Sequence, residues 1–448
     1  MTPAAGETGQ GASGHADFLR QFDLPTRKTI VVAVSGGSDS TALLLLTRDW
    51  RERAAPSVRI LAATVDHGLR PESAAEAAAV AALCSRLGID HVTLRWTGAK
   101  PATGLQAAAR EARLRLLADA AAAAGSDVVL TGHTLDDQIE TVAMRAGRGA
   151  GVGLAGMAPA TLVDGRVWIV RPLLGTRRDA LRAFLRERGI GWIDDPSNEN
   201  PAFERVRQRA LAPAIDPAPI AAAARERRDL AERAAALLDA HAVPVSRGLV
   251  RLDPAFPGAT DRDAAVHAFR ALLAALGGAE HLPDLARSSA LFDSLGAPRR
   301  ATLSRTVVDA RRAGVFLHRE SRGLPEPAAA ADGTIWDGRF RLRVEGPAGP
   351  TGPRVGPAGR AATPDGEAAA PASLVRAALA AEPALADGGE APMPLGEASF
   401  PVSAARLAMP WSRLLPSFDL PLAEAVARAV GAPGFRSPPC HGHKGAKA

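Results

Sequence analysis

A segment rich in glycine and serine carries the clearest chemical pattern in the chain. It consists of Ser35, Gly36, Gly37, Ser38, Asp39 and Ser40, and it follows a β-branched run from Thr29 to Val34. An apolar helical stretch follows, from Thr41 to Trp50. Glycine lets the backbone turn so that consecutive N–H groups converge on an anion, and a helix N-terminus adds partial positive charge. We interpret the segment as a phosphate-binding loop. No Gly-Lys-Ser/Thr follows, which excludes a Walker A loop, and a plain capped turn is the alternative.

Two further side chains stand where a second strand is expected to end. Val58 to Val65 is an apolar, β-branched run, and Asp66 and His67 follow it directly. Ligands bind at the carboxyl ends of parallel strands in open α/β sheets. We therefore expect Asp66 and His67 to line a nucleotide pocket, with a capped turn as the alternative.

Three carboxylates group on an expected helix after the strand Asp127 to Leu130. Asp136 and Glu140 are spaced i, i+4, and Asp137 lies beside them. Carboxylates grouped in this way suit Mg²⁺ that is held together with ATP phosphates. A helix cap is the alternative for Asp136 or Asp137, and the division between metal and substrate roles stays open.

Two arginines on an earlier helix could supply positive charge to the same site. Arg110 and Arg113 are spaced i, i+3 within the helix expected from Gly104 to Ala124, so they share one face. There they could reach a phosphate or the charge that develops on a substrate. A solvated helix face is the alternative.

The elements that position these residues alternate between strand and helix up to about residue 213. This order predicts an α/β fold, a parallel sheet with helices on both faces. Charged helical stretches at 220–242, 261–276 and 282–295 predict an all-α domain next, followed by a small α+β C-terminal region. We expect a flexible N-terminus at 1–26, a catalytic domain at 27–213, a helical domain at 214–300 and a C-terminal region at 301–448. A Gly/Pro-rich stretch at 345–372 reads as a linker or disordered insert.

Composition narrows the class of protein. The chain has 448 residues, 47% hydrophobic and 23% charged, with a formal net charge of +6. It holds two cysteines, Cys84 and Cys440, which excludes a disulfide framework and a four-cysteine zinc site. No apolar run approaches the ~20 residues of a membrane helix, and no secretory signal is visible. We expect a cytoplasmic protein with no membrane partner. Its basic, Arg-rich charge is compatible with nucleic acid, although codon bias explains most of the preference for Arg over Lys.

The phosphate loop resembles the signature of the ATP pyrophosphatases, which split ATP between the α and β phosphates. Further segments resemble the tRNA(Ile)-lysidine synthase family, over roughly Thr29 to Pro213. They are SGGSDS, VDHGLR, QAAAREAR, GHTLDDQIET, RGAGVGLAGM, VRPLL and DDPSN. Two positions depart from the family pattern: Leu114 replaces an aromatic residue, and Val206 replaces an asparagine.

The resemblance implies a reaction and its site. ATP and Mg²⁺ would activate the wobble cytidine of an isoleucine tRNA as an adenylylated base, and free L-lysine would then displace AMP at C2. The implied catalytic residues are Asp39, Asp136, Asp137 and Arg110. The implied metal ligands are Asp39, Asp136 and Glu140, and the loop at 35–40 with Asp66 and His67 would bind the nucleotide.

The partners and the alternatives follow from the same reading. The helical domain at 214–300 would bind tRNA. A cluster of arginines on or near one helix could contact tRNA phosphates, with a solvated helix face as the alternative. These arginines are Arg177, Arg178, Arg182, Arg186 and Arg188. A homodimer is one option for the assembly. One alternative is a sulfur-transferring tRNA enzyme of the same superfamily, which the lack of a Cys-x-x-Cys pair disfavours. A non-catalytic nucleotide-binding module is the other, and the clustered carboxylates speak against it.

Overall fold

The computed structural model of the chain describes ten stretches. They are residues 19–68, 72–98, 100–101, 103–146, 152–194, 216–345, 352–359, 370–386, 392–395 and 402–439. The segments Asp195 to Asn198 and Arg205 to Arg209, together with Cys440, lie outside the described residues. The chain forms two compact units, Met1–Arg225 with Arg436–Ala448, and Glu226–Phe435. The expected domain limits at residues 213 and 300 stay predictions.

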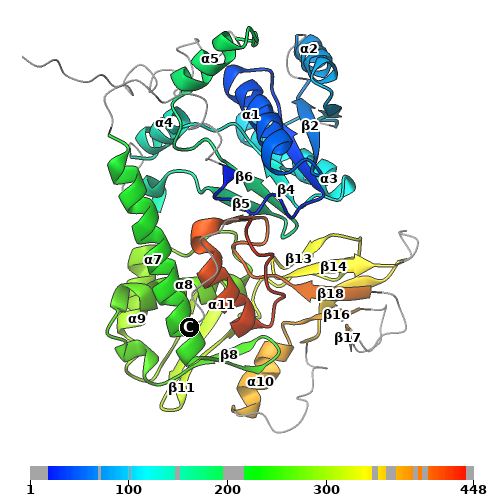
Figure 1. Cartoon of the computed structure of the whole chain (residues 1–448). Coiled ribbons are helices and arrows are strands. Elements are labelled where there is room, and N and C mark those ends of the chain that lie inside the picture. The colour runs from blue at the N-terminus through cyan, green and yellow to red at the C-terminus, as the bar shows by residue number, and fades with distance from the viewer. Residues whose placement is uncertain are drawn as a thin grey trace, which may run out of the picture. The chain divides into compact units, whose positions relative to one another are not determined.

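The first unit is built on a mixed sheet in which most neighbouring strands are parallel (Figure 1). Its strands are β1 (Thr29–Ala33), β2 (Arg59–Asp66), β3 (Asp90–Arg95), β4 (Val128–Leu130), β5 (Ala160–Val163) and β6 (Val167–Val170). Its helices include α1 (Ser38–Ala54), α2 (Ser73–Arg86), α3 (Leu105–Ala123), α4 (Leu135–Ala146) and α5 (Arg178–Glu187). This alternation confirms the expected α/β fold. The antiparallel pair of β5 and β6 was not expected, because their short hairpin adds a strand without a crossover helix.

The strand order fixes where a ligand can bind. Within this unit the strands run β5-β6-β4-β1-β2-β3, so the chain builds from β1 toward β3 and then resumes at β4, on the other side of β1. β1 pairs in parallel with both β2 and β4. The order therefore reverses between β1 and β4, and the crevice beyond their carboxyl ends is the usual ligand site of such sheets.

An apolar core fixes the sheet between its helices. One face of α3, with Leu117, Ala118 and Ala121, packs against buried sheet residues that include Val31 and Ile169. These side chains are almost wholly removed from solvent, and each buried Val, Leu or Ile stabilises the fold by about 1.5–3 kcal/mol.

Residues that precede β1 already pack into the core of the first unit. Leu19, Phe22 and Leu24 are each at most 1% exposed. The flexible N-terminus expected at 1–26 therefore does not extend over these residues, because their apolar side chains have a core to join.

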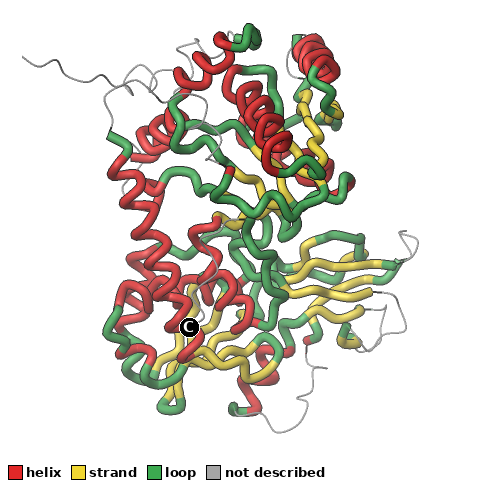
Figure 2. Tube along the Cα trace, viewed as in Figure 1, coloured by secondary structure: helices red, strands yellow, loops and turns green. Residues whose placement is uncertain are grey.

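The second unit combines helices with three antiparallel sheets (Figure 2). Its largest sheet has the order β7-β8-β11-β10-β9. The strands of that sheet are β7 (Ala242–Ser246), β8 (Leu249–Leu252), β9 (Arg299–Leu303), β10 (Thr306–Arg311) and β11 (Gly314–Arg319). The smaller sheets use β12 (Ala328–Ala329), β13 (Ile335–Trp336), β14 (Phe340–Val344), β15 (Arg354–Pro357), β16 (Pro383–Leu385), β17 (Met393–Pro394) and β18 (Val402–Arg406), and β19 (Leu414–Pro416) follows. The helices are α7 (Ala218–His241), which crosses the unit boundary, α8 (Arg262–Gly277), α9 (Leu285–Asp293), α10 (Ala372–Leu379) and α11 (Leu420–Val430).

Two features of this unit differ from the sequence analysis. The region expected to be all-α contains the hairpin of β7 and β8, which turns at Gly248 with a φ of 72°. Part of the Gly/Pro-rich stretch is also ordered: β15 pairs with β12 and β16, and its Val355 is 1% exposed. These three strands, β7, β8 and β15, have only four or five residues each, so their alternation was too brief to be distinguished from a loop. Within the described part of the chain, no helix is both long and apolar enough to cross a membrane.

Candidate active site

The segment from Ser35 to Ser40 forms a tight loop between β1 and α1. The Ser40 hydroxyl accepts a hydrogen bond from the Ser35 backbone N–H at 3.1 Å and donates to the Gly37 carbonyl at 3.1 Å. No side chain caps the N-terminus of α1. The first N–H groups of α1 and the positive end of its helix dipole are therefore available to bind an anion, as a phosphate site requires.

Two glycines allow close approaches around this loop. Gly36 has a φ of 86°, and a Cβ there would lie 2.6 Å from Cδ1 of Ile193. Gly132, just after β4, faces α1 so closely that a Cβ would lie 2.9 Å from the Asp39 carbonyl and the Ser40 nitrogen. Ile193 also donates its backbone N–H to the Gly36 carbonyl at 2.9 Å. The loop is thus held from both sides by backbone contacts.

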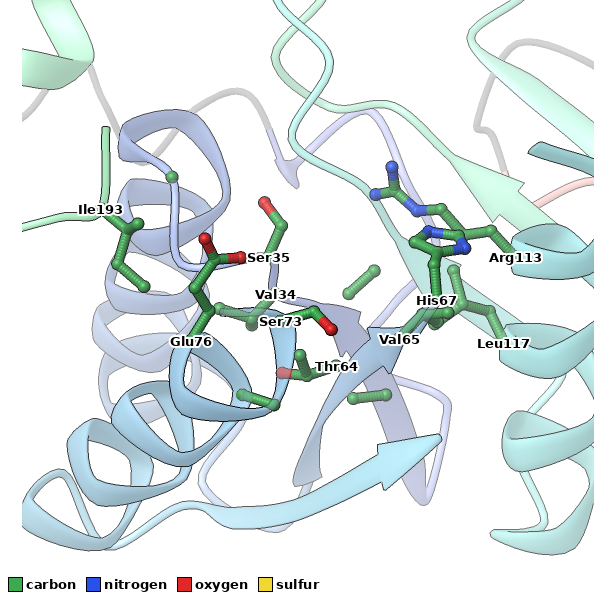
Figure 3. Close-up of a pocket in the computed structure, with 14 residues that line it drawn as sticks. Val34, Ser35, Thr64, Val65, His67, Ser73, Glu76, Arg113, Leu117 and Ile193 are labelled. Atoms are coloured by element: carbon green, nitrogen blue, oxygen red, sulfur yellow. The ribbon is translucent and has the colours of Figure 1, made fainter. Parts of the chain in front are cut away.

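A cavity of about 340 Å³ lies beside the loop. Figure 3 shows Ser35 and Glu76 toward one side of it and His67 and Arg113 toward the other. The lining residues are Ala33, Val34, Ser35, Gly37, Ala63, Thr64, Val65, His67, Ser73, Glu76, Ala77, Arg113, Leu117 and Ile193. A mixed polar and apolar cavity next to a phosphate loop has the character of a nucleoside pocket.

The two residues expected after β2 take different positions. His67 lines the cavity, and its buried Nδ1 has no hydrogen-bond partner within the described residues. Burial and the charge of Arg113 lower the pKa of His67, so the ring is neutral near pH 7. Asp66 instead ties the following turn: its Oδ1 accepts from the Gly68 N–H at 2.8 Å and the Ser73 hydroxyl at 2.7 Å. These hydrogen bonds lower the pKa of Asp66.

An acidic cluster forms where the N-termini of α1, α4 and α5 meet. Nε of Arg178 lies 2.8 Å from Oδ2 of Asp39, and its Nη2 lies 3.2 Å from Oδ1 of Asp137. Nη1 of the same guanidinium lies 3.7 Å from Oε1 of Glu140, whose side chain is 1% exposed. Burial raises the pKa of Asp39, although Arg178 opposes this shift. Burial alone would lower the pKa of Arg178, but the charges of Asp137 and Asp39 raise it.

Both adjacent carboxylates at the start of α4 also cap helices. Oδ2 of Asp137 accepts from the N–H and the hydroxyl of Thr134, at 2.8 and 3.0 Å. This is a capping box, in which the N-cap residue and the third helical residue bond to one another. Oδ2 of Asp136 accepts from the backbone N–H of Arg178 at 2.8 Å, and so caps α5. The capping alternative holds for both residues, and Asp137 in addition presents its second oxygen to the cluster.

Basic side chains gather near the carboxyl ends of β4 and β6. Arg171 is 6% exposed, and its Nη1 donates to the Ala158 carbonyl at 2.8 Å and the Thr161 hydroxyl at 2.9 Å. Burial, together with the charges of Arg110 and Arg113, lowers the pKa of Arg171 to about 9. Burial and Arg171 likewise lower the pKa of His133. Arg110, Arg113 and Arg171 thus concentrate positive charge in this part of the site.

The carboxylates fit Mg²⁺ only in company with phosphate oxygens. Among the described residues, no group of three or more His, Cys, Asp or Glu side chains is arranged to hold a metal ion. Arg178 already lies among Asp39, Asp137 and Glu140. Mg²⁺ is often held by one or two carboxylates plus substrate phosphates, and Asp39, at the phosphate loop, offers such a ligand.

The structure brings most of the expected residues together and adds others. The phosphate loop, His67, Arg113 and the carboxylates of α4 converge at the switch point, and Arg110 contributes to the basic group. Arg171 and His133 stand in segments quoted for the family resemblance, yet the sequence analysis did not select them. Ile193 carried no chemical signal in the sequence, because it contributes only packing and a backbone N–H.

This chain is similar to several known proteins. The model of the PP-loop domain matches residues 14–215. The tRNA(Ile)-lysidine synthase of Mesorhizobium japonicum is 54% identical over 431 residues, which cover 92% of this chain and 94% of the relative. That of Rhizobium meliloti is 42% identical over 446 residues, which cover 95% and 96%. Among solved structures, the U34-tRNA thiolase NcsA from Methanococcus maripaludis is 16% identical, with a TM-score of 0.41, and the match covers 47% of this chain and 76% of that chain. Because the likeness to the curated relatives spans nearly the whole chain, the protein belongs to the tRNA(Ile)-lysidine synthase family.

Proposed function

We propose that this protein is a ligase that uses ATP to join lysine to C2 of the wobble cytidine of an isoleucine tRNA. The observation that carries the proposal is the position of the phosphate loop. It lies at the switch point of the sheet, between a nucleoside-sized cavity and an acidic cluster. A site of this kind can hold ATP on one side and a cationic amino acid on the other. We place the reaction in the cytoplasm.

The first step is adenylylation of the base. The phosphates of ATP lie in the loop at 35–40, and O2 of the cytidine attacks the α-phosphate and releases pyrophosphate. Negative charge develops on the phosphoryl oxygens in this step. Arg110, Arg113 and Arg171 supply fixed positive charge for it, which is most effective in a partly buried site. Because unpaired RNA loop bases can be splayed out, the wobble base is accessible to such a site.

The second step joins lysine and expels AMP. The ε-amine of lysine must lose a proton before its lone pair attacks C2, and a carboxylate within reach can accept that proton. We assign this role to Asp136 or Asp137. Oδ1 of Asp137 faces the cluster, 3.2 Å from Nη2 of Arg178. Asp136 also positions the start of α5 by accepting the backbone N–H of Arg178.

Magnesium is part of the proposal as a companion of ATP. We assign Asp39 as its carboxylate ligand, and the ion would neutralise charge on the departing pyrophosphate. The charged helices within 214–300 remain our proposed tRNA-binding part, through contacts to backbone phosphates.

The test is a two-part assay with isoleucine tRNA, ATP and Mg²⁺. We expect pyrophosphate release with tRNA, and AMP release together with labelled lysine in the tRNA only when lysine is added. Arginine should not replace lysine. The variant Asp39→Asn should lose pyrophosphate release while tRNA binding stays nearly intact. Labelled sulfur entering the tRNA from a persulfide donor, in place of lysine, would contradict the proposal and favour a sulfur transferase.

A further inference from the structure

Arg178 is the cation at the centre of the acidic cluster. Three carboxylates from two helices surround its guanidinium: Asp39 from α1, and Asp137 and Glu140 from α4. All four side chains are at most 17% exposed. Solvent therefore screens these charges poorly, and their balance affects whatever binds beside them.

The backbone of Arg178 is fixed as firmly as its side chain. Its N–H donates to Asp136 at 2.8 Å, and the N–H of Leu135 donates to the Thr176 carbonyl at 3.0 Å. The start of α5 is thereby bonded to the start of α4. Arg178 cannot leave the cluster without a rotation of its own side chain.

Three of the other arginines on or near α5 lie away from the cluster. Arg188 pairs with Asp49 of α1 at 3.1 Å, and Arg182 lies 3.7 Å from Asp194. Arg186 lies over the ring of Trp192. Arg178 was expected to share a tRNA-facing surface with these three residues and Arg177. Arg178 instead points to the phosphate loop, and Arg177 lies 3.6 Å from Asp136.

The phosphates of ATP would be repelled by carboxylates at this loop. The polyphosphate is strongly anionic, and Asp39, within the loop, stands next to two more carboxylates. Like charges a few ångströms apart in a poorly screened site repel strongly. Arg178 contacts all three carboxylates at once, and its fork can bind more than one carboxylate in a defined geometry.

We propose that Arg178 is a positioning residue that allows ATP to bind beside the acidic cluster. Its positive charge reduces the electrostatic repulsion between the three carboxylates and the polyphosphate. Its planar guanidinium holds Asp39 of α1 close to Asp137 and Glu140 of α4. This inference rests on ATP binding at the loop, and it does not depend on which substrate is adenylylated.

The two contributions of Arg178 can be separated by substitution. Arg178→Lys keeps the positive charge but loses the planar fork, whereas Arg178→Gln loses the charge and most of the fork. If the positive charge is what permits ATP binding, Arg178→Lys should bind ATP nearly as well as the wild type. Its thermal stability should nevertheless stay below that of the wild type. A merely structural arginine would lose ATP affinity and stability together in both variants.

The experiment measures direct binding of Mg²⁺-ATP to the full-length protein by calorimetry, beside thermal unfolding. We expect Arg178→Gln to weaken ATP binding by about tenfold or more, which corresponds to about 1.4 kcal/mol. Arg178→Lys should bind ATP within roughly threefold of wild type, while its melting temperature stays close to that of Arg178→Gln. The matched control is Arg188→Gln, which removes another α5–α1 ion pair, to Asp49, away from the loop. It should leave ATP affinity within about twofold, as expected for a partly exposed pair.

Three results would overturn the inference. ATP could bind Arg178→Gln as tightly as wild type, or more tightly. Arg178→Lys could lose as much affinity as Arg178→Gln. Arg188→Gln could weaken ATP binding to the same extent. If circular dichroism shows that Arg178→Gln does not fold, the ATP affinity of Arg178→Lys alone tests the inference. Failure of lysine incorporation by the wild-type protein would count against the proposed ligase reaction only, since ATP binding is measured without tRNA or lysine.

Discussion

Replacing Gly132 by alanine tests the contact between the phosphate loop and β4. An added Cβ would lie 2.9 Å from the carbonyl carbon and oxygen of Asp39 and from the nitrogen of Ser40. Ordinary contact begins at about 3.4 Å, so the peptide between Asp39 and Ser40 must shift by roughly half an ångström. The atoms concerned are backbone atoms in the first turn of α1 and cannot rotate away as a side-chain end could.

The magnitude follows from the displacement. A misplacement of about 1 Å at a reacting group costs on the order of 100-fold in rate, so half that shift should cost roughly tenfold in kcat/KM for pyrophosphate release. Overpacking of this kind should also lower the free energy of unfolding by about 1–2 kcal/mol. The measurements are pyrophosphate release with tRNA and urea unfolding.

Gly191→Ala is the matched control for this substitution. A Cβ at Gly191 would meet nothing within 4 Å, although it stands two residues before Ile193 at the same loop. It should leave kcat/KM within about twofold, since such substitutions mainly restrict the unfolded chain. Wild-type kinetics and stability in Gly132→Ala would refute the described packing of β4 on α1.

Three further predictions concern stability and reactivity. Thr134→Ala should lower the free energy of unfolding by about 1 kcal/mol in a urea titration, because the hydroxyl that accepts from the Asp137 N–H and caps α4 is lost, whereas Thr134→Ser should retain most of that stability. Burial lowers the pKa of His267 to about 4. Between pH 6.5 and 4 the unfolded chain therefore binds a proton at this residue and the folded chain does not. Stability should therefore fall by up to about 3 kcal/mol as the pH drops from 6.5 to 4, and His267→Gln should flatten that part of the profile; an unchanged profile would contradict the burial of His267. Burial raises the pKa of the Cys84 thiol to about 11, so iodoacetamide should label the Cys84 peptide of the folded protein very slowly at pH 8, and rapid labelling in a mass spectrum would contradict its position.

Local patterns in the sequence were sufficient to predict most of the first unit, apart from β5. The run from Thr29 to Val34, the turn at Ser35 to Ser40 and the helix after it are contiguous, so their spacing alone indicates a strand, a loop and a helix N-terminus. The i, i+3 spacing of Arg110 and Arg113 predicted a shared face, and Arg113 does line the cavity.

Long-range relations could not be predicted in the same way. Arg178 and Asp39 are 139 positions apart, and nothing in an arginine-rich helix tells which arginine faces inward. Asp66 stands at the strand end as expected, but its carboxylate bonds locally to Gly68 and Ser73. The hairpin of β7 and β8 was missed because strands of four or five residues between long helices give too little alternation to recognise.

The most direct test of the proposed function is the fate of the wobble cytidine. Unmodified isoleucine tRNA is incubated with the full-length protein, ATP, Mg²⁺ and isotopically labelled lysine, then digested to nucleosides and analysed by mass spectrometry. The proposed function predicts one new nucleoside, a cytidine that carries the labelled lysine at C2, formed in proportion to the AMP and pyrophosphate released. A wobble cytidine that stays unmodified while ATP is consumed, or one that gains sulfur, would contradict it.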